Sequence, residues 1–246
     1  MSRPPFVLLH GAFRGGFTFG RVRERLAAEG HAVFTPSFTG CGDRAHLDRS
    51  TVTLETHITD VVSVLEQEDL TGAILVGHSY GGFIMTAASE RAAARIGHLV
   101  YLDAPVPHDG QRASDLVPRS PRPYPSASTS TGEASAEMPV EIPPTKVKAG
   151  AEYTEEDAQW VNARLTPMPT GPSFEPITLT SPTALALPRT YVFCSRSPPW
   201  IPAAYSRERF DEEGVPYRML DAGHDAPITA PAAVAALLLE IARSTT

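Results

Sequence analysis

Lysine, cysteine and long apolar segments are scarce in this chain of 246 residues. The chain has two lysines against nineteen arginines, and its net charge is -7. Phosphate contacts need clustered lysines and arginines, which the sequence does not show, so we expect no nucleic-acid partner. Two cysteines, Cys41 and Cys194, are too few for a disulfide scaffold or a thiolate metal site, although one bond between them stays open. The chain shows neither a membrane-spanning run nor a signal peptide. These absences predict a cytoplasmic protein without a membrane partner.

Motifs that hold metals or nucleotides are missing as well. The sequence contains no H-E-x-x-H, no G-x-x-x-x-G-K and no paired-cysteine spacing. The glycine pairs at 15–16 and 40–42 are not followed by the helix-opening pattern of a dinucleotide site. We therefore expect no metal and no cofactor.

Six short apolar runs bounded by glycine or proline are typical of strands buried on both faces. They are FVLL (6–9), AVFTP (32–36), GAILVG (72–77), HLVYLD (98–103), RTYVFC (189–194) and PYRML (216–220). Between them lie amphipathic helical patterns, at 54–65 and at 234–241. This alternation predicts an α/β fold, with a mostly parallel sheet of about six strands and helices on both faces.

The alternation is interrupted once, at 106–187. Part of this stretch, 118–144, has seven prolines and seven serines or threonines, a composition that predicts a mobile loop. Thr154 then precedes three acidic residues, which is the pattern of a helix start. We interpret 106–187 as an inserted cap, or lid, over a core built from 1–105 and 188–246.

Ser79 lies in Gly77-His78-Ser79-Tyr80-Gly81, which matches G-x-S-x-G between a predicted strand and a predicted helix. Small flanking residues allow a sharp turn that exposes a nucleophilic serine beside the positive end of a helix dipole. The alternative is a small-residue turn without chemistry. The strand before it and the helix after it favour the nucleophile.

A serine nucleophile requires a base and an oxyanion hole. His224 follows the last predicted strand, where it would reach Ser79, so we predict that it is the base rather than a solvated loop histidine. The backbone N–H groups of Tyr80, directly after the nucleophile, and Ala12, in the glycine-rich loop after the first strand, are the expected oxyanion donors. His10 more plausibly supports that loop than takes part in chemistry.

Several segments together resemble the α/β-hydrolase superfamily, and within it bacterial esterase-like hydrolases distantly similar to plant methylesterases and hydroxynitrile lyases. They are FVLLHGAF, TPSFTGCGDRAHL, ETHITDVVSVLE, LVGHSYGGF, LVYLDAPVPHDGQ and the AGHD near the end. The resemblance implies a core sheet with a lid, a Ser-His-acid triad and no cofactor. The plant relatives place the acid after the next-to-last strand, yet no Asp or Glu occurs between Arg189 and Arg207.

Asp103, which follows the strand at 98–103, is the predicted substitute for the missing acid. It would lie at the same sheet edge, one strand nearer the nucleophile. Asp221 and Asp225, near His224 in the sequence, stay open as alternative acids. A site without an acid also stays open, in which Ser195, Ser197 or a water molecule replaces the carboxylate.

Substrate recognition falls to the cap and the loops near the serine. Candidate pocket residues for a bulky or aromatic group are Phe13, Tyr80, Trp160, Met168, Phe174 and Trp200, and Arg14 could meet an anionic group. The chemistry that this pattern favours is hydrolysis of a carboxylic ester, lactone or thioester of a small molecule through an acyl-enzyme on Ser79. A lyase or cyclase using Ser79 and His224 for proton transfer, and a receptor-like binding module, are the alternatives. Monomer and homodimer both stay open.

Overall fold

The computed structural model describes residues 3–117 and 139–245. Six parallel strands form its main sheet, in the order β2-β1-β3-β4-β7-β8. Their bounds are β1 (Phe6–Leu9), β2 (Val33–Phe34), β3 (Ala73–His78), β4 (Ile96–Leu102), β7 (Arg189–Cys194) and β8 (Arg218–Leu220). Each lies within or next to a run predicted as a strand, so the predicted α/β fold is confirmed.

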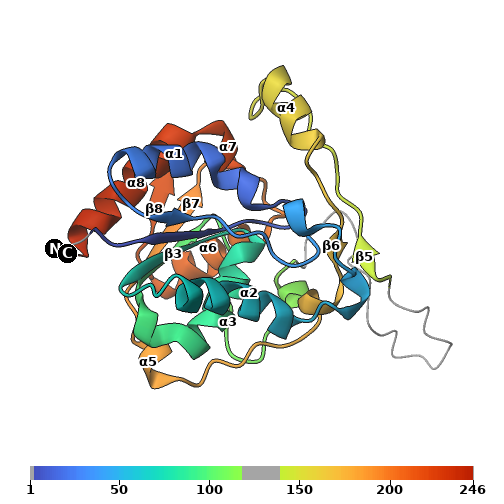
Figure 1. Cartoon of the computed structure of the whole chain (residues 1–246). Helices are drawn as coiled ribbons and strands as arrows, with labels where there is room; N and C mark the ends of the chain where they lie inside the picture. The colour runs from blue at the N-terminus through green and yellow to red at the C-terminus, as the bar shows by residue number, and fades with distance from the viewer. Residues whose placement is uncertain (1–2, 118–138, 246) are drawn as a thin grey trace.

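Helices cover both faces of this sheet (Figure 1). On one face lie α1 (Gly20–Ala28), α7 (Ala226–Thr229) and α8 (Pro231–Ser244), and on the other lie α2 (Leu54–Gln67), α3 (Tyr80–Ala92) and α6 (Pro202–Glu213). Successive side chains of a strand point to opposite faces. Leu8 and Val76 therefore pack in the cluster under α1 and α8, whereas Val7 and Leu75 pack in the one under α2 and α3.

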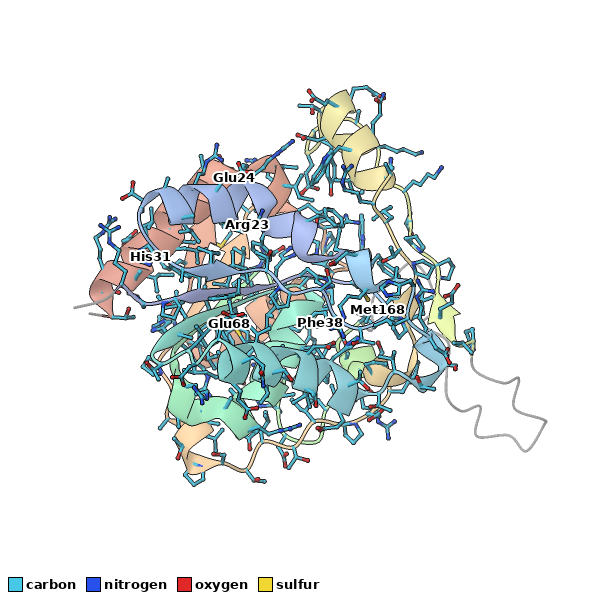
Figure 2. All side chains as sticks on the ribbon, in the orientation of Figure 1. Arg23, Glu24, His31, Phe38, Glu68 and Met168 are labelled. Carbon is cyan, nitrogen blue, oxygen red and sulfur yellow. The ribbon has the colours of Figure 1, made fainter. Side chains whose placement is uncertain are left out.

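Of the stretch from 106 to 187, the structure describes 106–117, which packs on the core through Val106, Ala113 and Leu116, and 139–187, which has two parts. The first carries α4 (Glu155–Asn162), which begins where predicted, since Thr154 caps it by accepting the N–H of Asp157, and which stands away from the sheet in Figure 1. The second contains α5 (Pro182–Leu185) and packs on the core, because Met168 and Ile177 are buried in the same cluster as Phe38 (Figure 2). The division into core and cap remains a prediction, and most of the loop predicted at 118–144 lies outside the described residues.

Short elements complete the described chain. A two-stranded antiparallel sheet joins β5 (Glu141–Ile142) to β6 (Met168–Pro169). The 3-10 segments are η1 (Gly16–Phe19), η2 (Gly42–Arg44), η3 (Arg49–Thr51), η4 (Ala93–Arg95), η5 (Ala113–Leu116) and η6 (Gly171–Ser173).

Two questions raised by the composition have structural answers. Cys41 and Cys194 are buried free thiols, so they do not form the disulfide that the sequence left open. Across 3–117 and 139–245, none of the helices is at once long and apolar enough to cross a bilayer. The cytoplasmic location stays a prediction.

Candidate active site

Ser79 occupies the turn between β3 and α3 in a backbone conformation that side chains rarely adopt, with φ 52° and ψ -125°. Strain of this kind costs about 1–3 kcal/mol and is typical of functional positions. The turn is tight enough to need its glycines. A Cβ on Gly77 would lie 2.6 Å from the Cα of Gly82, and a Cβ on Gly81 would collide with the carbonyl oxygen of Leu9. The turn therefore holds the serine at the carboxyl edge of the sheet, directly before the first residue of α3.

His224 lies within hydrogen-bond distance of that serine. Its Nε2 is 3.1 Å from Ser79 Oγ, although the two residues are 145 positions apart. The loop after β8 carries the ring across the edge of the sheet. With the proton on Nδ1, Nε2 can accept the hydroxyl proton of Ser79.

Asp103 orients the other side of the ring. His224 Nδ1 donates to Asp103 Oδ2 at 2.6 Å, and the backbone N–H of Cys194 and the hydroxyl of Ser197 donate to the same carboxylate. Asp103 follows β4 with a φ of 45°, another strained position. Burial works against ionisation, but the hydrogen bonds from His224, Cys194 and Ser197 outweigh it and lower the pKa of Asp103 below its usual value. The carboxylate is thus held ionised behind the imidazole.

The alternative acids have other partners. Asp221 binds Arg196 and Ser195 near the surface. Asp225 is buried and accepts from Arg14 and from the hydroxyl of Tyr153. Within the described part of the chain, neither makes a hydrogen bond to the His224 ring. The structure therefore brings Ser79, His224 and Asp103 together and leaves Asp221 and Asp225 apart from them.

His78 supports the base, a role that the sequence analysis missed. Its Nε2 donates to the backbone oxygen of His224 at 2.8 Å, and the two ring centroids are 4.8 Å apart. Burial, together with the neighbouring His224, lowers the pKa of His78 to about 4, so the ring is neutral near pH 7. The position of His78 directly before the nucleophile does not indicate that its ring contacts a residue 146 positions later in the chain.

The loop after β1 approaches the nucleophile closely. A Cβ on Gly11 would lie 3.0 Å from Ser79 Cβ, a closer contact than most Cβ atoms make, so a larger residue there would press on the serine side chain. Ala12 and Tyr80, the predicted oxyanion donors, both line the cavity above Ser79. His10 lies under this loop, where Nε2 accepts the N–H of Phe38 and Nδ1 donates to the oxygen of Gly11. Its contacts match the supporting role expected for it.

A cavity of about 560 Å³ opens over Ser79 and His224. Four of the predicted pocket residues line it: Phe13, Arg14, Tyr80 and Trp200. Trp160 does not line the cavity. It lies on α4, which stands away from the sheet, and its indole ring packs against Phe17, with Arg164 over the ring face. Two further candidates, Met168 and Phe174, also lie outside the lining.

Arg14 is not available as a single positive charge. Its guanidinium is buried and paired with the carboxylate of Asp225, which also accepts from Tyr153. The backbone N–H of Asp225 donates to Glu152 at 2.7 Å. The charge of Arg14 is thus compensated by Asp225, and contact of Arg14 with an anionic substrate group stays a prediction. This network joins the loop after β1, the residue after His224 and the segment before α4.

Comparison with known proteins gives the family of the chain. The family model described as Alpha/beta hydrolase family matches residues 6–237. The chain belongs to this family. As an α/β hydrolase, it is a member of a family of hydrolytic enzymes, and the resemblance noted from the sequence is confirmed.

Relatives of this α/β hydrolase include a carbendazim hydrolyzing esterase of Nocardioides sp. (strain SG-4G), which is 36% identical over 92% of this chain and 94% of its own length. Among solved structures, an extracellular α/β-hydrolase of a Paenibacillus species is 24% identical with a TM-score of 0.75, covering 96% of this chain and 98% of that one. A methylesterase of Arabidopsis is 22% identical with a TM-score of 0.77, covering 97% and 98%. The two structures show the same fold.

Proposed function

We propose that this α/β hydrolase cleaves a carboxylic ester of a small, hydrophobic or aromatic molecule through an acyl-enzyme on Ser79. The observation that carries the proposal is the continuous chain of hydrogen bonds from Asp103 through His224 to Ser79 at the base of the cavity. The 36% identical esterase supports the ester class, and it makes carbendazim a first substrate to test.

The reaction proceeds in two halves. Ser79 Oγ attacks the ester carbonyl while His224 Nε2 takes its proton, and Asp103 stabilises the imidazolium. The N–H groups of Ala12 and Tyr80 stabilise the oxyanion. His224 then gives the proton to the leaving alcohol, which departs. Water, deprotonated by His224, attacks the acyl carbon and releases the acid and the free serine.

The cavity determines which esters fit. A volume of about 560 Å³ suits a small molecule rather than a polymer. Phe13, Tyr80 and Trp200 contribute aromatic surface to its wall, and Trp200 is half-exposed. Flat aromatic esters are therefore the first choice of substrate.

Covalent labelling tests the nucleophile. A fluorophosphonate probe should label one site, which peptide mapping places on Ser79, and purified protein should hydrolyse p-nitrophenyl acetate and carbendazim. Ser79→Ala should abolish labelling and His224→Ala should slow it strongly, whereas Ser50→Ala, at an exposed serine on η3, should label as wild type does. Folded wild-type protein that neither labels nor hydrolyses any ester would refute the proposal, and it would favour proton-transfer chemistry or binding.

A further inference from the structure

Glu152 is a partly buried carboxyl on the cavity wall that has no cationic partner in the described part of the chain. Its Oε1 accepts the N–H of Asp225 at 2.7 Å, whereas its Oε2 makes no hydrogen bond to any described residue. Burial raises the pKa of Glu152 above its usual value. A partly buried carboxyl that lines a cleft beside a catalytic base and keeps one oxygen without a protein partner among the described residues is a candidate for a functional role.

The carboxyl lies against the chain that carries the catalytic base. A Cβ on Gly223, the residue before His224, would collide with the Glu152 carboxyl group, so the glycine provides its space. The next residue, Tyr153, is buried and its hydroxyl donates to Asp225. Glu152 is thereby fixed beside the base, on the wall of the same cavity.

Other charged groups on this wall are already paired. Arg14 and Asp225, which both line the cavity, compensate each other. Glu152 therefore differs from them in having an oxygen available to a ligand. The complementary ligand group is a hydrogen-bond donor.

We propose that Glu152 determines substrate specificity by accepting, through Oε2, a hydrogen bond from an N–H group next to the scissile carbonyl. This inference rests on the proposed ester hydrolysis and narrows its substrates to carbamate esters and to esters of heteroaromatic acids that carry a ring N–H. Phe13 and Trp200 contact the ring while Glu152 binds the N–H. An ester without that donor leaves the carboxyl desolvated and unpaired, which sites built for hydrogen bonding penalise strongly.

Matched substrates test this role. The assay compares kcat/KM for a methyl N-arylcarbamate, its N-methyl analogue and a methyl arenecarboxylate of similar size, for wild type, Glu152→Leu and Glu152→Gln. In wild type, the preference for the N–H carbamate over the N-methyl analogue should exceed that of Glu152→Leu by about 10- to 100-fold. Glu152→Gln keeps an acceptor oxygen and should retain most of the preference.

The ratio separates recognition from general damage. Losing the Asp225 N–H bond in Glu152→Leu would lower kcat/KM for all three substrates alike and leave their ratios unchanged. Glu156→Leu removes an exposed carboxylate from the first turn of α4 and should preserve the wild-type ratios. Equal ratios in wild type and Glu152→Leu would overturn the proposal while ester hydrolysis stands. Absence of turnover for every ester would instead refute the proposed function.

Discussion

Replacing Asp103 with asparagine tests the acid at the end of β4. The two side chains have the same shape, and the amide oxygen can still accept the N–H of Cys194. The amide nitrogen then faces His224 Nδ1, which must become an acceptor and move its proton to Nε2. A histidine protonated on Nε2 cannot take the proton of Ser79, so we expect the chemical step to slow while substrate binding is kept.

The expected loss can be worked out from this tautomer change. In a serine protease triad, the same replacement lowers kcat about 10⁴-fold. Each tenfold corresponds to about 1.36 kcal/mol, so the barrier should rise by about 5 kcal/mol. KM should change little, because Asp103 is buried behind the imidazole and does not line the cavity.

Steady-state hydrolysis of p-nitrophenyl acetate at pH 7.5 measures the effect, with circular dichroism to show that the variant is folded. Ser197→Ala is the matched control, since it removes one hydrogen bond to Asp103 but leaves the carboxylate and its contact with His224. Its kcat should fall by no more than about tenfold, the scale of one hydrogen bond. An Asp103→Asn variant that keeps more than a tenth of the wild-type kcat would show that another group orients the base.

Two further predictions concern stability. Gly81→Ala places a Cβ against the Leu9 carbonyl and should lower Tm strongly. Gly20→Ala is the control and should not lower Tm, because nothing lies within 4 Å of its Cβ. Equal melting temperatures of the two variants would contradict the close approach of Gly81 to Leu9. Burial lowers the pKa values of three histidines, to about 3 for one and to about 4 for the other two. The unfolded chain therefore binds more protons than the folded chain below about pH 6.5. The free energy of unfolding, measured by urea unfolding, should fall as the pH drops from about 6.5 towards 4, by up to about 4 kcal/mol per pH unit. These residues are His10, His57 and His78. His57→Gln should reduce that slope by about a third, and an unchanged slope would show that His57 does not contribute.

Local patterns in the sequence were sufficient to predict the fold and the positions of two site residues. Each strand is a short apolar run bounded by breakers, and Ser79 and His224 occupy fixed places relative to predicted strands. Asp103 could be named because β4 lies next to β3, a neighbour relation that the hydrolase resemblance supplied. Their catalytic roles remain predictions until the variants are measured.

The contacts around the site could not be predicted, because they join residues far apart in the chain without any periodicity. Asp225 and Arg14 are 211 positions apart, and Glu152 reaches Asp225 across 73. Trp160 fails as a pocket residue for a related reason. The sequence shows that Trp160 is an aromatic residue of the predicted cap. The direction in which α4 leaves the core, and hence the contact of the Trp160 ring with Phe17, depends on tertiary packing that no local pattern encodes.

The placement of the acid on β4 has a consequence for engineering. Since the carboxylate stands on a strand next to that of the nucleophile, the segment at 198–201 after β7 carries no member of the proposed triad, yet Pro198, Trp200 and Ile201 all border the cavity. Combinatorial libraries confined to these positions would reshape the cavity wall while the hydrogen-bonded chain from Asp103 to Ser79 is left intact. Part of the cavity wall can thus be varied without changing a member of the proposed triad, which makes this hydrolase a practical starting point for directed evolution.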